Sequence, residues 1–170
     1  MERLLIPKER LKLLEKDPKL IGKVSKLCSC KIGIEDEGIE ISGEPFGEFS
    51  AKNILFAFGR GFDIDTACEL YNDDFYFSLI DLDQYFNSEK RIHQVKARII
   101  GENGKVKENI ESVSKARISV YGNTVSIIGK INEVDEAKTC IVALIEGESH
   151  RSAYRKMEAA HRKNRLEMHI

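Results

Sequence analysis

The feature that most constrains the fold is an internal repeat. Sliding the first part of the chain by 86 positions, the separation between Glu15 and Gly101, aligns it with the second part without a gap. The apolar positions then coincide from a helical stretch through two alternating stretches to another helical stretch. The matching segments include 12–14 with 98–100, 31–34 with 117–120, and 39–43 with 125–129. The chain is therefore expected to contain two small domains of one kind.

Each copy is expected to consist of a strand, two helices, two strands and a final helix. In the first copy these elements fall at 3–6, 8–15, 18–27, 31–34, 38–41 and 45–58, with a shorter helix after Asp63. In the second copy they fall at 75–82, 89–100, from 105, 117–121, 124–128 and 131–146. The strands alternate in period two and the helices follow a period near 3.6. The sequence therefore predicts an α+β fold with two small sheets.

The chain is expected to hold a first domain over 1–72, a second over 73–147 and a basic C-terminal helix over 148–170. Its 170 residues, 42% of them hydrophobic, are enough to bury a core. Lys and Arg number 27 while Asp and Glu number 28, so the net charge of -1 gives no overall preference for nucleic acid. A basic surface would need local segregation of charge.

The cysteines carry no sign of a metal site. Cys28, Cys30, Cys68 and Cys140 sit mostly in apolar patterns, and no second pair or nearby histidine completes a zinc site. They are expected to be buried free thiols in a reducing compartment. The start of the chain lacks a signal-peptide core, and no apolar run approaches the ~20 residues that cross a bilayer. We therefore expect a cytoplasmic protein with no membrane contact, metal or cofactor.

One turn distinguishes the two copies. Between its first two helices the second copy has Gly101-Glu102-Asn103-Gly104, where the first has Glu15-Lys16-Asp17-Pro18. Glycines permit positive φ and a close approach to a phosphate, and the helix after Gly104 points free amides toward an anion. In the first copy Pro18 cannot donate an amide and the acids repel phosphate. The first domain should therefore be structural or bind protein, and replacing both glycines by Asp should abolish binding without unfolding the second.

The residues around Gly101 suit a groove for single-stranded nucleic acid. Lys105 and Lys107 add positive charge, while Arg98 and Arg117 stand at the margins. An apolar floor for bases is predicted from Ile99, Ile100, Val106, Ile110 and Ile118. Glu102 is a departure, because its carboxylate would face the phosphates. A Walker-type loop is excluded, since only two residues separate the glycines and Val106 replaces the required Ser or Thr.

Two further clusters suggest alternatives. The basic C-terminal segment either extends the groove, with Arg151 and Arg155 on phosphates and Tyr154 stacked on a base, or is a solvated helix. The acidic pairs Asp63/Asp65 and Asp81/Asp83 would be the site of a metal-dependent nuclease. No histidine or third acid lies near either pair in the sequence, so the nuclease is the weaker hypothesis.

The element order with this Gly-x-x-Gly turn resembles the type I KH domain, the type with a C-terminal helix. In that family the turn clamps the backbone of about four single-stranded nucleotides. The resemblance implies two tandem KH-like domains, the first degenerate, and an RNA-binding rather than catalytic role. The residues expected to contact RNA are Arg98, Ile99, Ile100, Gly101, Glu102, Asn103, Gly104, Lys105, Lys107, Ile110, Arg117, Ile118, Arg151, Tyr154 and Arg155.

A closer resemblance covers nearly the whole chain. The broken helix at 58–62, the segment 63–67, the block 98–120 and the basic tail are similar to the "partner of Nob" proteins of small-subunit ribosome assembly. This implies binding of single-stranded rRNA near its 3′ end, and contact with the Nob-type endonuclease. In archaea it also implies the alpha subunit of translation initiation factor two. The missing long N-terminal extension of eukaryotic members favours an archaeal source. A generic KH module of an RNA-degradation or translation complex is the alternative.

Overall fold

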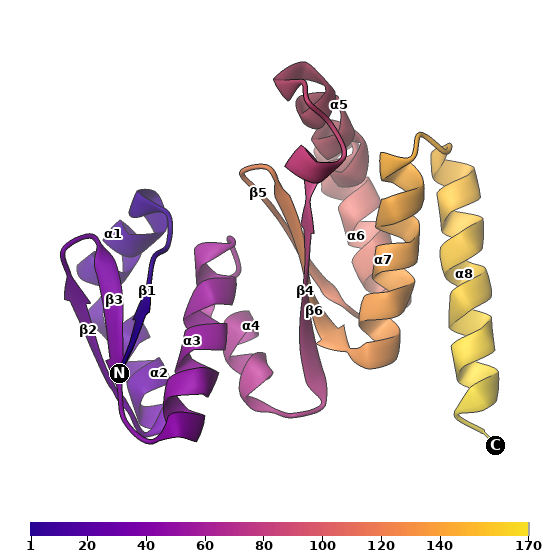
Figure 1. Cartoon of the computed structure of the whole chain (residues 1–170). Coiled ribbons are helices and arrows are strands. Elements are labelled where there is room, and N and C mark those ends of the chain that lie inside the picture. Colours follow the sequence, from indigo (N-terminus) through magenta and orange to yellow (C-terminus); the bar gives the residue numbers. More distant parts are fainter. Residues whose placement is uncertain (170) are drawn as a thin grey trace. The chain divides into compact units, whose positions relative to one another are not determined.

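The structure, a computed structural model, describes residues 1–169 and divides the chain into two compact units, Met1–Asp73 and Asp74–Ile170. Each unit contains one three-stranded antiparallel sheet with helices packed against it (Figure 1). The strand order is β1-β3-β2 in the first sheet and β4-β6-β5 in the second, so the last strand of each unit lies in the middle. The internal repeat seen in the sequence is therefore a repeat of topology.

The first unit follows the predicted element order. It comprises β1 (Glu2–Leu4), α1 (Lys8–Lys16), α2 (Pro18–Cys28), β2 (Lys31–Glu35), β3 (Gly38–Ser42), α3 (Pro45–Gly59), α4 (Ile64–Cys68) and the 3-10 turn η1 (Glu69–Tyr71). Strand β1 is shorter than the predicted 3–6. Its partner β3 starts at Gly38 and pairs Ile39 with Leu4, so no ladder continues beyond Leu4.

The second unit adds one helix to the same plan. It comprises β4 (Phe75–Asp81), the 3-10 turn η2 (Leu82–Gln84), α5 (Glu89–Ile100), the 3-10 turn η3 (Glu102–Gly104), α6 (Lys105–Ser114), β5 (Arg117–Tyr121), β6 (Thr124–Lys130), α7 (Ile131–Ile145) and α8 (His150–Glu167). Ser88 is the N-cap residue of α5 as predicted, although its side chain makes no capping hydrogen bond. The turn of interest joins α5 to α6.

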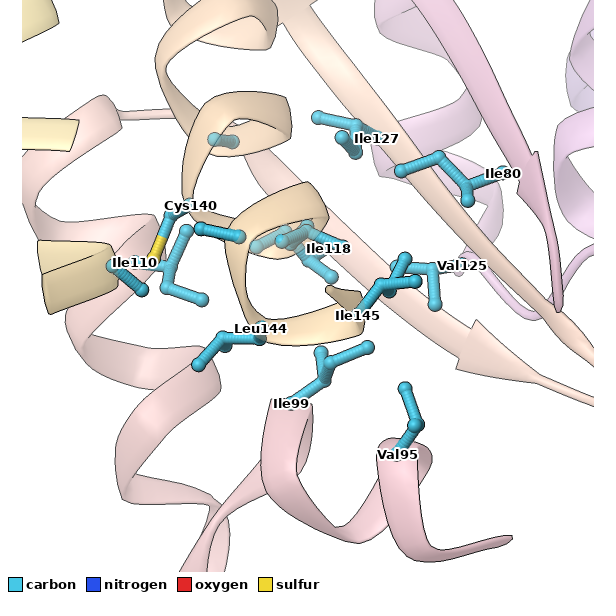
Figure 2. Close-up of a cluster of buried hydrophobic side chains, with 14 of the residues drawn as sticks. Ile80, Val95, Ile99, Ile110, Ile118, Val125, Ile127, Cys140, Leu144 and Ile145 are labelled. Carbon is cyan, nitrogen blue, oxygen red and sulfur yellow. The ribbon is translucent and has the colours of Figure 1, made fainter. Parts of the chain in front are cut away.

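The core of the second unit lies between one face of its sheet and the helices. Figure 2 shows the side chains converging, with strand residues Ile80, Ile118, Val125 and Ile127 meeting helix residues Val95, Ile99, Ile110, Cys140, Leu144 and Ile145. The strand residues alternate along β4, β5 and β6, as expected for strands with one buried face. The ends of α5 and α6 are therefore fixed on a rigid base, and the turn between them is held with them.

Helix α8 packs on α7 as part of the second unit. Its fully covered apolar residues are Ala153 and Met157. Polar bonds supplement them, because Glu136 of α7 is only 3% exposed and accepts hydrogen bonds from His161 Nδ1 at 2.9 Å and Asn164 Nδ2 at 3.0 Å. The predicted basic segment is thus a docked helix. None of the helices in residues 1–169 is long and apolar enough to cross a membrane.

Cys68 is expected to react with N-ethylmaleimide before the other cysteines at neutral pH. Cys28, Cys30 and Cys140 are buried and Cys68 is half-buried, all as free thiols. Burial raises the pKa of the Cys28 and Cys140 thiols to about 12, which leaves little of the reactive thiolate. Peptide mass spectrometry over a time course of native labelling gives the order. Labelling of Cys140 as fast as Cys68 would contradict the packing.

Candidate nucleic-acid interface

The turn between α5 and α6 is built from residues with positive φ. Gly101 has φ +76°, Asn103 +53° and Gly104 +73°, and Lys105 then starts α6. The Gly101 amide still donates to the Ala97 carbonyl at 2.8 Å, and the Gly104 amide donates to the Gly101 carbonyl at 3.2 Å. Asparagine tolerates this region better than most residues, and glycine adopts it freely. The glycine positions predicted from the sequence are therefore required by the backbone.

The two glycines have different surroundings. A Cβ atom on Gly101 would lie 2.3 Å from Val106 Cγ2 and 2.9 Å from the Val106 amide nitrogen. A Cβ atom on Gly104 would meet no atom within 4 Å. Gly101 therefore closes the turn against α6, whereas Gly104 leaves its outer surface open. The expectation that both could become Asp without unfolding is wrong for Gly101, because its side chain would collide with Val106.

The charge around the turn is nearly balanced. Lys105 is exposed, but so are Glu102 and Glu108. Lys107 lies 3.5 Å from a Glu111 carboxylate oxygen, and the same oxygen accepts a hydrogen bond from the Ile118 amide at 2.8 Å. The first turn of α6 supplies free amides and the positive end of a helix dipole. The turn therefore offers geometry for an anion with little net positive charge beside it.

The predicted apolar floor lies mostly below the surface. Ile99 and Ile110 are fully buried and Ile118 is 4% exposed, all within the core of the second unit. Only Ile100 and Val106 are half-buried and present apolar surface. The prediction that Ile99, Ile110 and Ile118 contact bases is therefore corrected. Their apolar spacing reflects packing of α5, α6 and β5 on one another, which the same periodicity serves.

Arg98 connects helices and does not stand free at a groove margin. Its Nη1 donates to the Leu144 carbonyl at 2.8 Å and its Nη2 donates to the Glu148 carbonyl. His150 Nε2 in turn donates to the Arg98 carbonyl at 2.9 Å. Arg98 thus satisfies carbonyl groups at and beyond the end of α7, where helices leave acceptors unpaired. The prediction of an RNA contact is replaced by a structural role.

Helix α8 begins beside the turn, because His150 is bonded to Arg98, three residues before Gly101. Arg151 and Arg155 are exposed, and Arg162 and Arg165 follow on the same side of the helix at helical spacing. These four arginines are called the α8 arginine stripe. It forms a basic surface that starts close to the turn.

Tyr154 does not belong to that surface. Its ring is half-buried and packs against the core of the second unit. Burial raises the pKa of its hydroxyl, while a hydrogen bond with Asn109 of α6 acts in the opposite direction. The prediction that Tyr154 stacks on a base is therefore wrong, because the ring is used to dock α8 on α6. Arg117, by contrast, is exposed at the start of β5 as expected.

The equivalent turn of the first unit is closed to anions by its own carboxylate. Asp17 has φ -127°, so no left-handed residue is used, and its Oδ1 accepts a hydrogen bond from the Lys19 amide at 3.1 Å. Pro18 occupies the first position of α2 and has no amide hydrogen to offer. An anion approaching α2 at this end would meet a negative charge already in place.

The acidic pairs are turn caps. Asp63 accepts hydrogen bonds from the Thr66 amide and hydroxyl at 2.9 and 2.8 Å, and Asp81 accepts one from the Asp83 amide at 3.0 Å. Across residues 1–169 no group of three or more His, Cys, Asp or Glu side chains is placed to hold a metal ion. The nuclease hypothesis therefore finds no candidate site at these pairs.

Comparison with known proteins agrees with the fold. Residues 76–162 match the family model of the second KH domain of PNO1, a eukaryotic-type KH domain, KH-domain type I. A KH domain-containing protein of Methanocaldococcus jannaschii is 35% identical over 170 residues, covering 96% of this chain and 75% of the relative. The predicted α+β fold of KH-like units is thereby confirmed.

Two further relatives carry information in their names. The pre-rRNA-processing protein pno1 of Aspergillus fumigatus is 35% identical over 100 residues, 56% of this chain, which spans only 39% of that relative. A crystal structure of an a/eIF2alpha-aDim2p-rRNA complex from Pyrococcus horikoshii contains a similar chain, with a TM-score of 0.86 and 32% identity. The match covers 95% of this chain and 94% of that one.

Proposed function

The chain belongs to the PNO1 family of KH-domain proteins, and we propose that it is an RNA-binding factor in rRNA processing. The single observation that carries the proposal is the α5–α6 turn. It has three residues of positive φ at the start of a helix and an open surface over Gly104. The matching turn of the first unit holds a carboxylate at this place. One chain thus contains an anion site and its closed counterpart.

We propose that the clamp holds the backbone of about four single-stranded nucleotides. The phosphates lie against the amides of Gly101 to Gly104 and of the first turn of α6, near Lys105. Ile100 and Val106 provide the apolar surface for bases, and Arg117 stands at the margin of the groove. Because the charge at the turn is nearly balanced, the α8 arginine stripe attracts the continuing strand.

The RNA is proposed to be the 3′ region of small-subunit rRNA. The relatives named for pre-rRNA processing and the neighbour crystallised with rRNA support this choice. In this proposal the protein does not cleave RNA itself, and it holds the strand for a Nob-type endonuclease. The neighbour's complex with a/eIF2alpha supports the alpha subunit of translation initiation factor two as a further partner.

The purified chain is expected to bind a single-stranded oligonucleotide from the 3′ end of small-subunit rRNA. It should not bind the same oligonucleotide annealed to its complement, because a turn that clamps one backbone leaves no room for a paired strand. Fluorescence anisotropy with both probes measures the difference, and a shuffled single strand tests sequence preference. Equal affinity for the duplex would contradict a KH clamp. Equal affinity for the shuffled strand would contradict the assignment of the RNA.

A further inference from the structure

Helix α2 of the first unit has a basic face. It carries Lys19, Lys23 and Lys26 and no acidic residue. Spacings of four and three residues place the lysines on one side of the helix, and all three are exposed. Gly22 lies among them, and a Cβ atom there would meet nothing within 4 Å. The three lysines, called the α2 lysine face, therefore stand around an open stretch of helix.

Charge is segregated within the first unit. Residues 8–31 contain eight Lys and Arg against three Asp and Glu, while residues 35–48 contain six Asp and Glu and no Lys or Arg. Solvated helices usually mix the two signs through i, i+4 pairs. Lys23 does form an ion pair, with Asp65 of α4. None of the ion pairs within residues 1–169 involves Lys19 or Lys26. The ends of the α2 lysine face are thus uncompensated.

The corresponding helix of the second unit is less basic. In the alignment of the two copies Lys19, Lys23 and Lys26 match Lys105, Asn109 and Ser112 of α6. Helix α6 carries two lysines and two glutamates, and one lysine is paired with one glutamate. The helix that follows the closed turn therefore carries more positive charge than the helix that follows the open one. A domain that only supports its neighbour would gain nothing from this distribution.

We propose that the α2 lysine face is a second contact for the phosphate backbone of RNA, independent of base sequence. The proposal rests on the proposed function, since the clamp is what brings a polyanion to this chain. Lysines act as point charges without the planar fork that arginine uses to fix a geometry, which suits a contact that reads no bases. Lys19 and Lys26 stand about 10 Å apart along the helix at 1.5 Å per residue, enough to meet more than one phosphate.

The test compares two double variants of the full chain. Lys19→Gln with Lys26→Gln removes the uncompensated charges and leaves Lys23 with Asp65, and glutamine keeps the helix propensity of lysine. Lys90→Gln with Lys138→Gln, on exposed positions of α5 and α7, is the control with the same change in net charge. Each is titrated against an rRNA 3′-end probe that fills only the about four nucleotides of a KH groove. The second titration uses a long single-stranded transcript that contains this probe.

For the long transcript, the α2 variant should lower the dependence of log affinity on log salt by about 1.4, or about 0.7 for each lost phosphate contact on single strands. Its affinity should fall to the same extent for transcripts of different sequence. Short-probe affinity and the control variant should match the unaltered chain. Unchanged long-RNA affinity in the α2 variant, or an equal loss in the control, would overturn the proposal. Failure of the unaltered chain to bind the short probe would instead overturn the clamp.

Discussion

Gly104→Asp is expected to lower the affinity for single-stranded RNA by at least tenfold, about 1.4 kcal/mol, without unfolding the protein. A side chain at this position meets no atom within 4 Å, so the fold has room for it. Aspartate also tolerates left-handed backbone better than most residues, and Gly104 is the N-cap residue of α6, where aspartate is favoured. Thermal unfolding should therefore change little. RNA titration of the folded variant measures the loss.

The reason for the loss is already present in the first unit. There Asp17 caps α2 through the Lys19 amide and occupies the position an anion would take. Gly104→Asp places a carboxylate at the matching end of α6, where it competes with the phosphate for the same amides and repels it. The substitution thus makes the second turn resemble the first in charge. Retention of RNA binding would show that the turn is not the site.

Gly122→Asp is the matched control. Gly122 lies in the β5–β6 hairpin with φ +56°, and a Cβ atom there also meets nothing within 4 Å. The substitution introduces the same charge at the same kind of backbone position, away from the α5–α6 turn. Its RNA affinity should stay near that of the unaltered chain. An equal loss in both variants would point to net charge and not to the position of Gly104.

The fold could be predicted because apolar spacing is a local property repeated in two copies. The two glycines and the Asp17 cap were visible for the same reason, since each acts on backbone within a few residues. The role of Ile99, Ile110 and Ile118 was not, because periodicity shows that a side chain points inward without showing what covers it. Tyr154 was misplaced for a related reason. An exposed-looking tail gives no sign of the helix against which it docks.

Arg98 had no signal in the sequence at all. Its acceptors are main-chain carbonyls of Leu144 and Glu148, and any residue there would supply the same groups. The first unit uses the same device, with Arg10 donating to the carbonyls of Phe58 and Phe62 at 2.8 and 2.6 Å. Yet Arg10 does not align with Arg98 in the repeat, so the register hides the correspondence. Such contacts become visible only when the helices are placed.

Arg98→Met is accordingly expected to destabilise the protein by about 2–3 kcal/mol, because hydrogen bonds from a charged donor contribute roughly that much and the two carbonyls lose their partner. Methionine keeps much of the aliphatic length. Denaturant unfolding gives the change in the free energy of unfolding, which should be larger than that of Arg117→Met at an exposed site. Arg98→Lys should recover little, since an ammonium group lacks the fork that reaches two acceptors.

RNA affinity separates the two roles that Arg98 and Arg117 were first given together. At a temperature where both variants are folded, Arg98→Met should bind the single-stranded probe nearly as well as the unaltered chain. Arg117→Met should bind it more weakly and show a shallower salt dependence, because it removes an exposed charge beside the groove. If Arg98→Met lost RNA affinity with no change in unfolding free energy, the guanidinium would have to leave the Leu144 and Glu148 carbonyls to reach the strand. The docking of α7 on α5 would then be conditional on the absence of RNA.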